Sequence, residues 1–207
     1  MTICVKLALV LEMNYITFDI ETYIPEGVKD RSSGGKLDTE SMRVSVIGAY
    51  YSWLDKYIAF YEDDVKDFID SLEYADFIVG YNHISFDLPV LQKYSTKNLQ
   101  KLNNYDILVE FQKKVGYRTK LDNIAQSTLN TKKTDTYATF RNYHLEGKWF
   151  ELTDYCLNDV LITEQIYRRI IQGDALKYSD MLKTFEVILD LPSQSSTQAS
   201  VEPELLW

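Results

Sequence analysis

The 207-residue sequence has only two cysteines and no hydrophobic run long enough to cross a membrane. Cys4 and Cys156 lie far apart and have no spacing typical of a metal site. They favour a reducing compartment, although one long-range disulfide is left open. The most apolar stretch, residues 3–11, is interrupted by Lys6 and has neither the basic start nor the small-residue cleavage site of a signal peptide. We therefore expect a soluble, cytoplasmic protein with no membrane partner.

The motifs of nucleotide-cofactor proteins are also absent. No G-x-G-x-x-G occurs, so the sequence does not indicate a nucleotide cofactor. The stretch SSGGK at 32–36 lacks the G-x-x-x-x-G-K-[ST] frame of a phosphate-binding loop. The two histidines, His83 and His144, stand without a Cys or His partner at metal-ligand spacing.

The composition is that of a globular protein, with 45% hydrophobic and 26% charged residues, which excludes a disordered or fibrous chain. The length corresponds to one domain, or to one domain with a tail. We predict a single domain over 1–192, in which residues 1–12 form an extra strand or a peripheral extension. The polar segment 193–207 is predicted to be a tail.

The net charge of −9 argues against a nucleic-acid partner, but the charge is unevenly distributed. Residues 1–91 hold 7 Lys and Arg against 16 Asp and Glu, residues 92–150 hold 11 against 5, and residues 151–207 hold 4 against 10. A basic middle between acidic flanks is expected when a phosphate-binding face lies beside metal-binding carboxylates. A solvated basic surface explains the charge pattern equally well.

Hydrophobic periodicity predicts an α/β fold with a mixed central sheet flanked by α-helices. The predicted strands span residues 15–20, 43–53, 57–61, 77–81 and 185–189. The predicted helices begin at Asp63 and at Asp87, and cover about 106–115, 121–129 and 152–171.

Asp19 and Glu21 lie two residues apart at the end of the first predicted strand. Period-two alternation places both carboxylates on the same side of the sheet. Two like charges held so close are costly unless a cation shares them. Such pairs more often face solvent, so this motif alone is weak.

Asp87 follows a predicted strand and a polar loop that begins with Asn82. As an alternative to a functional role, Asp87 is a good N-cap for the helix that carries Pro89. The cap explains Asp87 but leaves Asn82 unexplained.

Tyr155 and Asp159 are four residues apart on the longest predicted helix, so they project from one face about one turn apart. Asp154 lies beside them and is a competing candidate. Taken together with the two earlier motifs, the helix completes a set of four acids: Asp19, Glu21, Asp87 and Asp159. Four carboxylates of this kind can hold two Mg²⁺ or Mn²⁺ ions, which prefer oxygen ligands and can act together on a phosphodiester.

The segments ITFDIET (16–22), YNHISFDLPVL (81–91) and YCLND (155–159) resemble the three motifs of the DEDD 3′–5′ exonucleases, which have an RNase H-like fold. A Tyr four residues before the last Asp is typical of the DEDDy branch, whereas the DEDDh branch has a His where this sequence has Asp154. The residues FDIET and YNxxxFDLP are most similar to those in the proofreading exonuclease domains of B-family DNA polymerases and in their stand-alone relatives. The resemblance covers roughly residues 14–171.

The resemblance implies a role for each motif residue. It makes the four acids the metal ligands, and it makes Tyr155 the residue that hydrogen-bonds the nucleophilic water. It places Asn82 and Phe86 against the 3′ end of the substrate, and the backbone around Thr22 against the terminal nucleotide.

Basic residues in the middle of the chain are the candidates for phosphate contacts: Lys113, Lys114, Arg118, Lys120, Lys132 and Lys133. Phe111, Tyr117 and Tyr137 are interleaved with them and could stack on bases. Core packing is the stronger alternative for these aromatic residues.

The leading hypothesis is a stand-alone, metal-dependent 3′–5′ exonuclease of single-stranded nucleic acid with a free 3′ end, DNA rather than RNA. Because the sequence ends at residue 207, we expect it to act without a polymerase in the same chain. Two alternatives remain: a catalytically silent nucleic-acid-binding module of the same fold, and a structure-selective endonuclease that uses the same metal site.

Overall fold

A computed structural model describes residues 13–33, 37–131 and 143–192 of the chain. The predicted extension at 1–12, the predicted tail, and the candidates Lys132, Lys133 and Tyr137 lie outside the described residues. Within the described part, no helix combines the length and the apolar character needed to cross a membrane.

A mixed five-stranded sheet forms the centre of the fold, in the order β3-β2-β1-β4-β5. Its strands are β1 (Tyr15–Tyr23), β2 (Arg43–Tyr51), β3 (Lys56–Tyr61), β4 (Phe77–Gly80) and β5 (Asn104–Asp106). The first three form an antiparallel meander, and β4 and β5 add in parallel on the other side of β1. The predicted α/β class with a mixed sheet is therefore confirmed.

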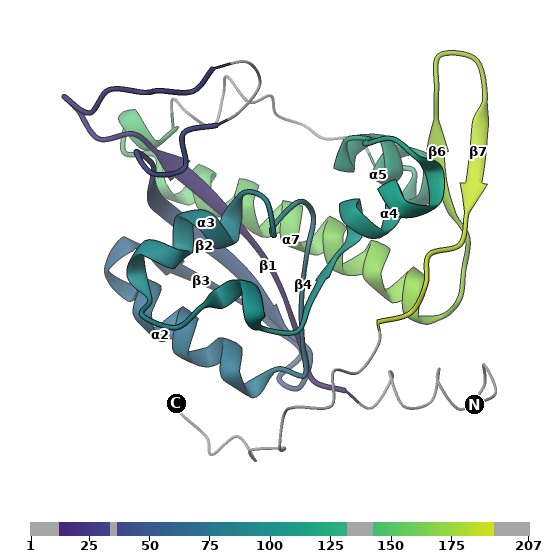
Figure 1. Cartoon of the computed structure of the whole chain (residues 1–207), viewed down its shortest axis with the longest axis horizontal. Helices are drawn as coiled ribbons and strands as arrows, with labels where there is room; N and C mark the ends of the chain where they lie inside the picture. Colours follow the sequence, from purple (N-terminus) through teal and green to yellow (C-terminus); the bar gives the residue numbers. More distant parts are fainter. Residues whose placement is uncertain (1–12, 34–36, 132–142, 193–207) are drawn as a thin grey trace.

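Helices cover both faces of this sheet (Figure 1). They are α2 (Val65–Ser71), α3 (Asp87–Leu91), α4 (Ile107–Val115), α5 (Leu121–Leu129) and α7 (Trp149–Ile171). One apolar cluster joins α2 and α3 to one face of the sheet, and a second joins α7, α4 and α5 to the other. Central strands covered on both faces lose the polar alternation of a half-exposed strand, and all but the first residue of β2 are buried accordingly.

The packing of α7 onto the sheet depends on Gly48 in β2, which is paired directly with Asp19. A Cβ atom at this position would lie 3.1 Å from side-chain atoms of Cys156, Leu157 and Val160 on α7. Cys156 also accepts a hydrogen bond from the Gly48 amide. The absence of a side chain at Gly48 therefore allows the helix to approach the backbone of the strand.

A β-bulge interrupts the pairing of β1 with β2 near the end of β1. Glu21 pairs with Val46 and Thr22 pairs with Val44, so Ser45 is the extra residue on β2. A bulge of this kind re-aims the side chains around it.

The last strand differs from the prediction. Instead of one strand at 185–189, the chain forms a hairpin of β6 (Leu176–Ser179) and β7 (Thr184–Val187) that packs beside α5 (Figure 1). These strands have four residues each, and β5 has three, so periodicity has too few positions to identify them. Similarly, α2 begins at Val65, after a 3₁₀ turn at Glu62–Asp64 where the sequence predicted the start of the helix.

Candidate metal centre

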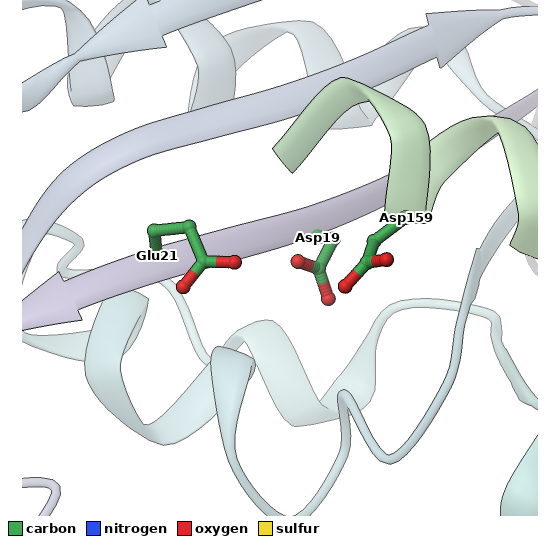
Figure 2. Close-up of side chains that lie close together, drawn as sticks. All are labelled: Asp19, Glu21 and Asp159. Carbon is green, nitrogen blue, oxygen red and sulfur yellow. The ribbon is translucent and has the colours of Figure 1, made fainter. Parts of the chain in front are cut away.

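Three of the four predicted acids converge where α7 crosses β1. Asp19 and Glu21 project from β1, and Asp159 projects from α7 beside Asp19 (Figure 2). One carboxylate oxygen from each lies within 4.8 Å of the others. Glu21 and Asp159 are buried and Asp19 is half-buried, so the cluster sits at the edge of the core with one side open.

Electrostatic repulsion makes this cluster costly without a cation. At 4.8 Å, two carboxylates repel each other by about 3 kcal/mol at an effective dielectric constant of 20. A divalent cation bound between the carboxylates would replace this repulsion by attraction. The donor set consists of carboxylate oxygens, which suits a hard ion such as Mg²⁺ or Mn²⁺. The three acids could therefore bind a metal ion.

Asp87, the fourth predicted acid, lies against the same strand. It is the first residue of α3, it is buried, and its Oδ1 accepts a hydrogen bond of 3.1 Å from the amide of Ile20. That amide belongs to the residue between Asp19 and Glu21, and β4 has already ended at Gly80 on this side of β1. The alternative of a helix cap is wrong, because no side chain caps α3 and its N-cap position is Phe86.

Burial raises the pKa of the Asp87 carboxyl to about 7, and the charge of Asp106 adds to this rise. Its hydrogen bond from Ile20 acts in the opposite direction but does not offset the desolvation. In the absence of a cation, the folded protein therefore holds this carboxyl protonated over a wider pH range than the unfolded chain does.

Asp106, which the sequence analysis did not single out, holds the loop before Asp87. Its two carboxylate oxygens accept hydrogen bonds from the amides of Asn82 (2.9 Å) and Ile84 (3.1 Å), and Oδ1 also caps α4. Asn82 adopts a left-handed conformation with φ of 67°. The loop is thus tied to the end of β5. The only signal in the sequence was an Asp at the start of a predicted helix.

His83 lies on the inner side of this loop and is fully buried. Its Nδ1 is 3.6 Å from Asp106 Oδ2, and its Nε2 is 3.2 Å from Asn104 Oδ1. Burial lowers the pKa of His83, so the ring is neutral at physiological pH. The ring also lies against Gly80, where a Cβ atom would be 2.8 Å away. His83 is therefore part of the support for the loop.

Tyr155 lies on α7, one turn before Asp159, and it packs against the cluster of Val46, Leu152 and Cys156. Thr22 donates a hydrogen bond to the sulfur of Met42. Phe86 is half-buried against the core on the α3 face.

The four described basic candidates have different surroundings. Lys113 pairs with Glu110, and Lys114 pairs with Asp190, so both are engaged with acidic neighbours. Lys120 is exposed at the start of α5 and lines a polar cavity of about 580 Å³ beside the hairpin. Of these four residues, Arg118 contacts a predicted site residue, because it donates a hydrogen bond to Oδ1 of Asn82.

No protein-family model matches the chain, and no curated protein matches its sequence. Among solved structures, the chain is similar to the family B DNA polymerase from the hyperthermophilic archaeon Pyrobaculum calidifontis, with a TM-score of 0.51 and 20% identity. The match covers 78% of this chain and 25% of that chain, so this protein spans about a quarter of the length of the polymerase. The similarity concerns the fold and is consistent with an RNase H-like architecture.

Gly48→Ala is expected to disturb the cluster without touching a carboxylate. The added methyl would lie 3.1 Å from three side chains of α7, which must shift by a few tenths of an ångström, and we expect this crowding to lower the free energy of unfolding by about 1–3 kcal/mol. Displacing Asp159 should also weaken Mn²⁺ binding roughly tenfold, the usual scale for a supporting residue. Calorimetric titration with Mn²⁺ measures this, and Cys156→Ala in the same chain should restore part of the affinity. Unchanged affinity in folded Gly48→Ala would contradict the packing argument.

Asp87→Asn should change how stability depends on pH in EDTA. The folded pKa of about 7 lies above the unfolded value of about 3.9, so the contribution of Asp87 is complete below pH 3.9 and is lost as pH rises through 7. Asn cannot ionise. Between pH 5 and 8, the wild type should therefore lose roughly 2–3 kcal/mol relative to the variant in urea unfolding. The exposed control Asp67→Asn should show the same pH dependence of stability as the wild type. If Asp87→Asn also shows that dependence, the raised pKa does not belong to Asp87.

Proposed function

We propose that the chain is a metal-dependent 3′–5′ exonuclease that hydrolyses single-stranded nucleic acid, DNA rather than RNA, to 5′-mononucleotides. The observation that carries the proposal is the approach of Asp19, Glu21 and Asp159 to within 4.8 Å of one another. Asp87 stands against the same strand, bound to the amide between the first two acids. The resemblance of the three motifs to the DEDDy exonucleases supports the reaction class.

The four acids would hold two divalent cations. When bound, such ions supply Lewis-acid activation of a water and stabilise the leaving oxygen of the phosphodiester. The chain itself supplies a rigid set of oxygen donors on a strand and a helix, so that little reorganisation is needed when substrate arrives.

Tyr155 would orient the attacking water. It lies one turn before Asp159 on the same helix, and α7 is locked to β2 at Gly48. A hydroxyl held on a rigid helix can fix the direction of attack more precisely than one on a loop. Its contribution would be to orient the attacking water.

The loop of Asn82 and Phe86 would contact the 3′ end of the strand. Asp106 fixes this loop through two backbone amides, and Arg118 adds a positive charge beside the Asn82 side chain. Arg118 would thus supply a positive charge beside this loop, where it could neutralise a backbone phosphate. Lys113 and Lys114 would contribute less, because acidic neighbours already occupy them.

The test is degradation of a 5′-labelled single-stranded oligonucleotide, DNA beside matched RNA, with Mg²⁺, Mn²⁺ or EDTA. We expect a metal-dependent ladder that shortens from the 3′ end. Asp19→Asn and Asp159→Asn should each slow it more than about a hundredfold, and Tyr155→Phe by up to about a hundredfold with Mn²⁺ binding retained. Asp154→Asn is the matched control, an exposed acid on the same helix.

Other outcomes would contradict the proposal in distinct ways. Cleavage of circular single-stranded DNA would show endonuclease action, because a circle has no 3′ end. Binding of the oligonucleotide without any cleavage in either metal would leave a nucleic-acid-binding module.

A further inference from the structure

A second cavity, of about 540 Å³, lies at the end of β1. Its aromatic walls include Tyr23, Tyr61 and Trp149, and the rings of the last two meet edge to face with centroids 6.1 Å apart. Both of these rings are about 40% exposed, so part of their surface is available to a ligand. The volume is in the range of small-molecule sites.

The cavity lies beyond the carboxylates along β1, where Tyr23 forms part of its wall. Asp19, Glu21 and Tyr23 alternate along the strand and therefore share the face that α7 covers, each about 7 Å from the next. The Tyr23 ring stacks on His144 with centroids 4.0 Å apart, and His144 meets Trp149 at the start of α7. A molecule that reaches the metal cluster with one group can thus reach this cavity with another.

Two buried polar atoms in the wall lack hydrogen bonds. Ser45, the bulge residue, is 3% exposed, and its Oγ finds no partner among the residues that the structure describes. The same holds for Nδ1 of His144. Buried polar groups are nearly always paired in native proteins, so hydrogen bonding in this wall is incomplete among the described residues.

The charged groups in the wall select the kind of ligand. Glu62 and Asp63 line the cavity, and no Lys or Arg is among the described residues of its lining. Glu62 is held in place because its two oxygens accept from the hydroxyls of Tyr23 (2.8 Å) and Tyr94 (3.0 Å). Ionised carboxylates only accept hydrogen bonds. These two carboxylates therefore suit a flat ring that carries donor groups.

We propose that this cavity discriminates between the bases of the 3′-terminal nucleotide, favouring those with an exocyclic amino group over thymine. Adenine, cytosine and guanine each carry such an NH₂ donor, which can reach Glu62 or Asp63. Thymine has no amino group, and its one donor on that edge, the ring N3–H, lies between two carbonyls that would face the acceptor oxygens. The ring would lie against Tyr61 and Trp149. This inference rests on the proposed nuclease function for the placement of the nucleotide.

The experiment uses four single-stranded DNA oligonucleotides that differ only in the 3′-terminal base. Release of the first nucleotide is measured in a single turnover with Mn²⁺. We expect the dT end to react roughly tenfold more slowly than the dC end, the scale of one base-specific hydrogen-bonded contact. Glu62→Gln, which replaces one acceptor oxygen by a donor, should bring the ratio close to one. The exposed control Asp67→Asn should keep the wild-type ratio of the dC and dT release rates.

A binding measurement separates this inference from the nuclease proposal. Tryptophan fluorescence, to which Trp149 in the cavity wall contributes, is followed as dCMP or dTMP is added with Mn²⁺. Tighter binding of dCMP that Glu62→Gln abolishes would support the cavity even if no oligonucleotide were cleaved. Equal release rates from all four ends, or equal affinities for dCMP and dTMP, would overturn the inference while leaving the nuclease proposal intact. The comparison of dCMP with dTMP in the wild-type protein tests the inference even if Glu62→Gln fails to fold.

Discussion

The contact between α7 and β2 at Gly48 is the constraint on which the site depends. Asp159 lies beside Asp19 where the helix packs closely on the strand, and the strand residue opposite Asp19 has no side chain between them and the helix. The 23-residue length of α7 spreads its apolar contacts over several strands, so the position of the helix is set by the whole core. The position of the candidate metal centre is therefore a product of global packing, although its acids belong to local motifs.

The different end points of β1 and β4 determine where Asp87 binds. β1 continues past the end of its parallel partner β4, which leaves the Ile20 amide available on that edge. Asp87 occupies this place and is thereby held against the amide of the residue between the two acids of β1. The loop before Asp87 is fixed in turn by Asp106 at the end of β5, which accepts two hydrogen bonds from amides of the loop. Backbone amides, which do not depend on side-chain identity, thus position both ends of the loop.

Patterns of residues were sufficient for much of the fold. The β-branched and aromatic runs located β1 to β4, and the spacing of Val65, Phe68 and Ile69 located the buried face of α2. Period-two and four-residue spacings also grouped Asp19 with Glu21 and Tyr155 with Asp159. What the sequence could not supply were features that depend on register between distant segments. The bulge at Ser45 and the bonds of Asp106 belong to this class, because no local pattern encodes a partner twenty residues or more away.

The most direct test of the account is the location of the metal itself. A crystal soaked in Mn²⁺ and measured at the manganese absorption edge would give anomalous peaks at the bound ions. The account predicts a peak between Asp19, Glu21 and Asp159, and a second beside it within reach of Asp19 or Asp87. Manganese at other sites only, or no peak in crystals soaked well above millimolar Mn²⁺, would contradict the assignment of this cluster as a metal centre.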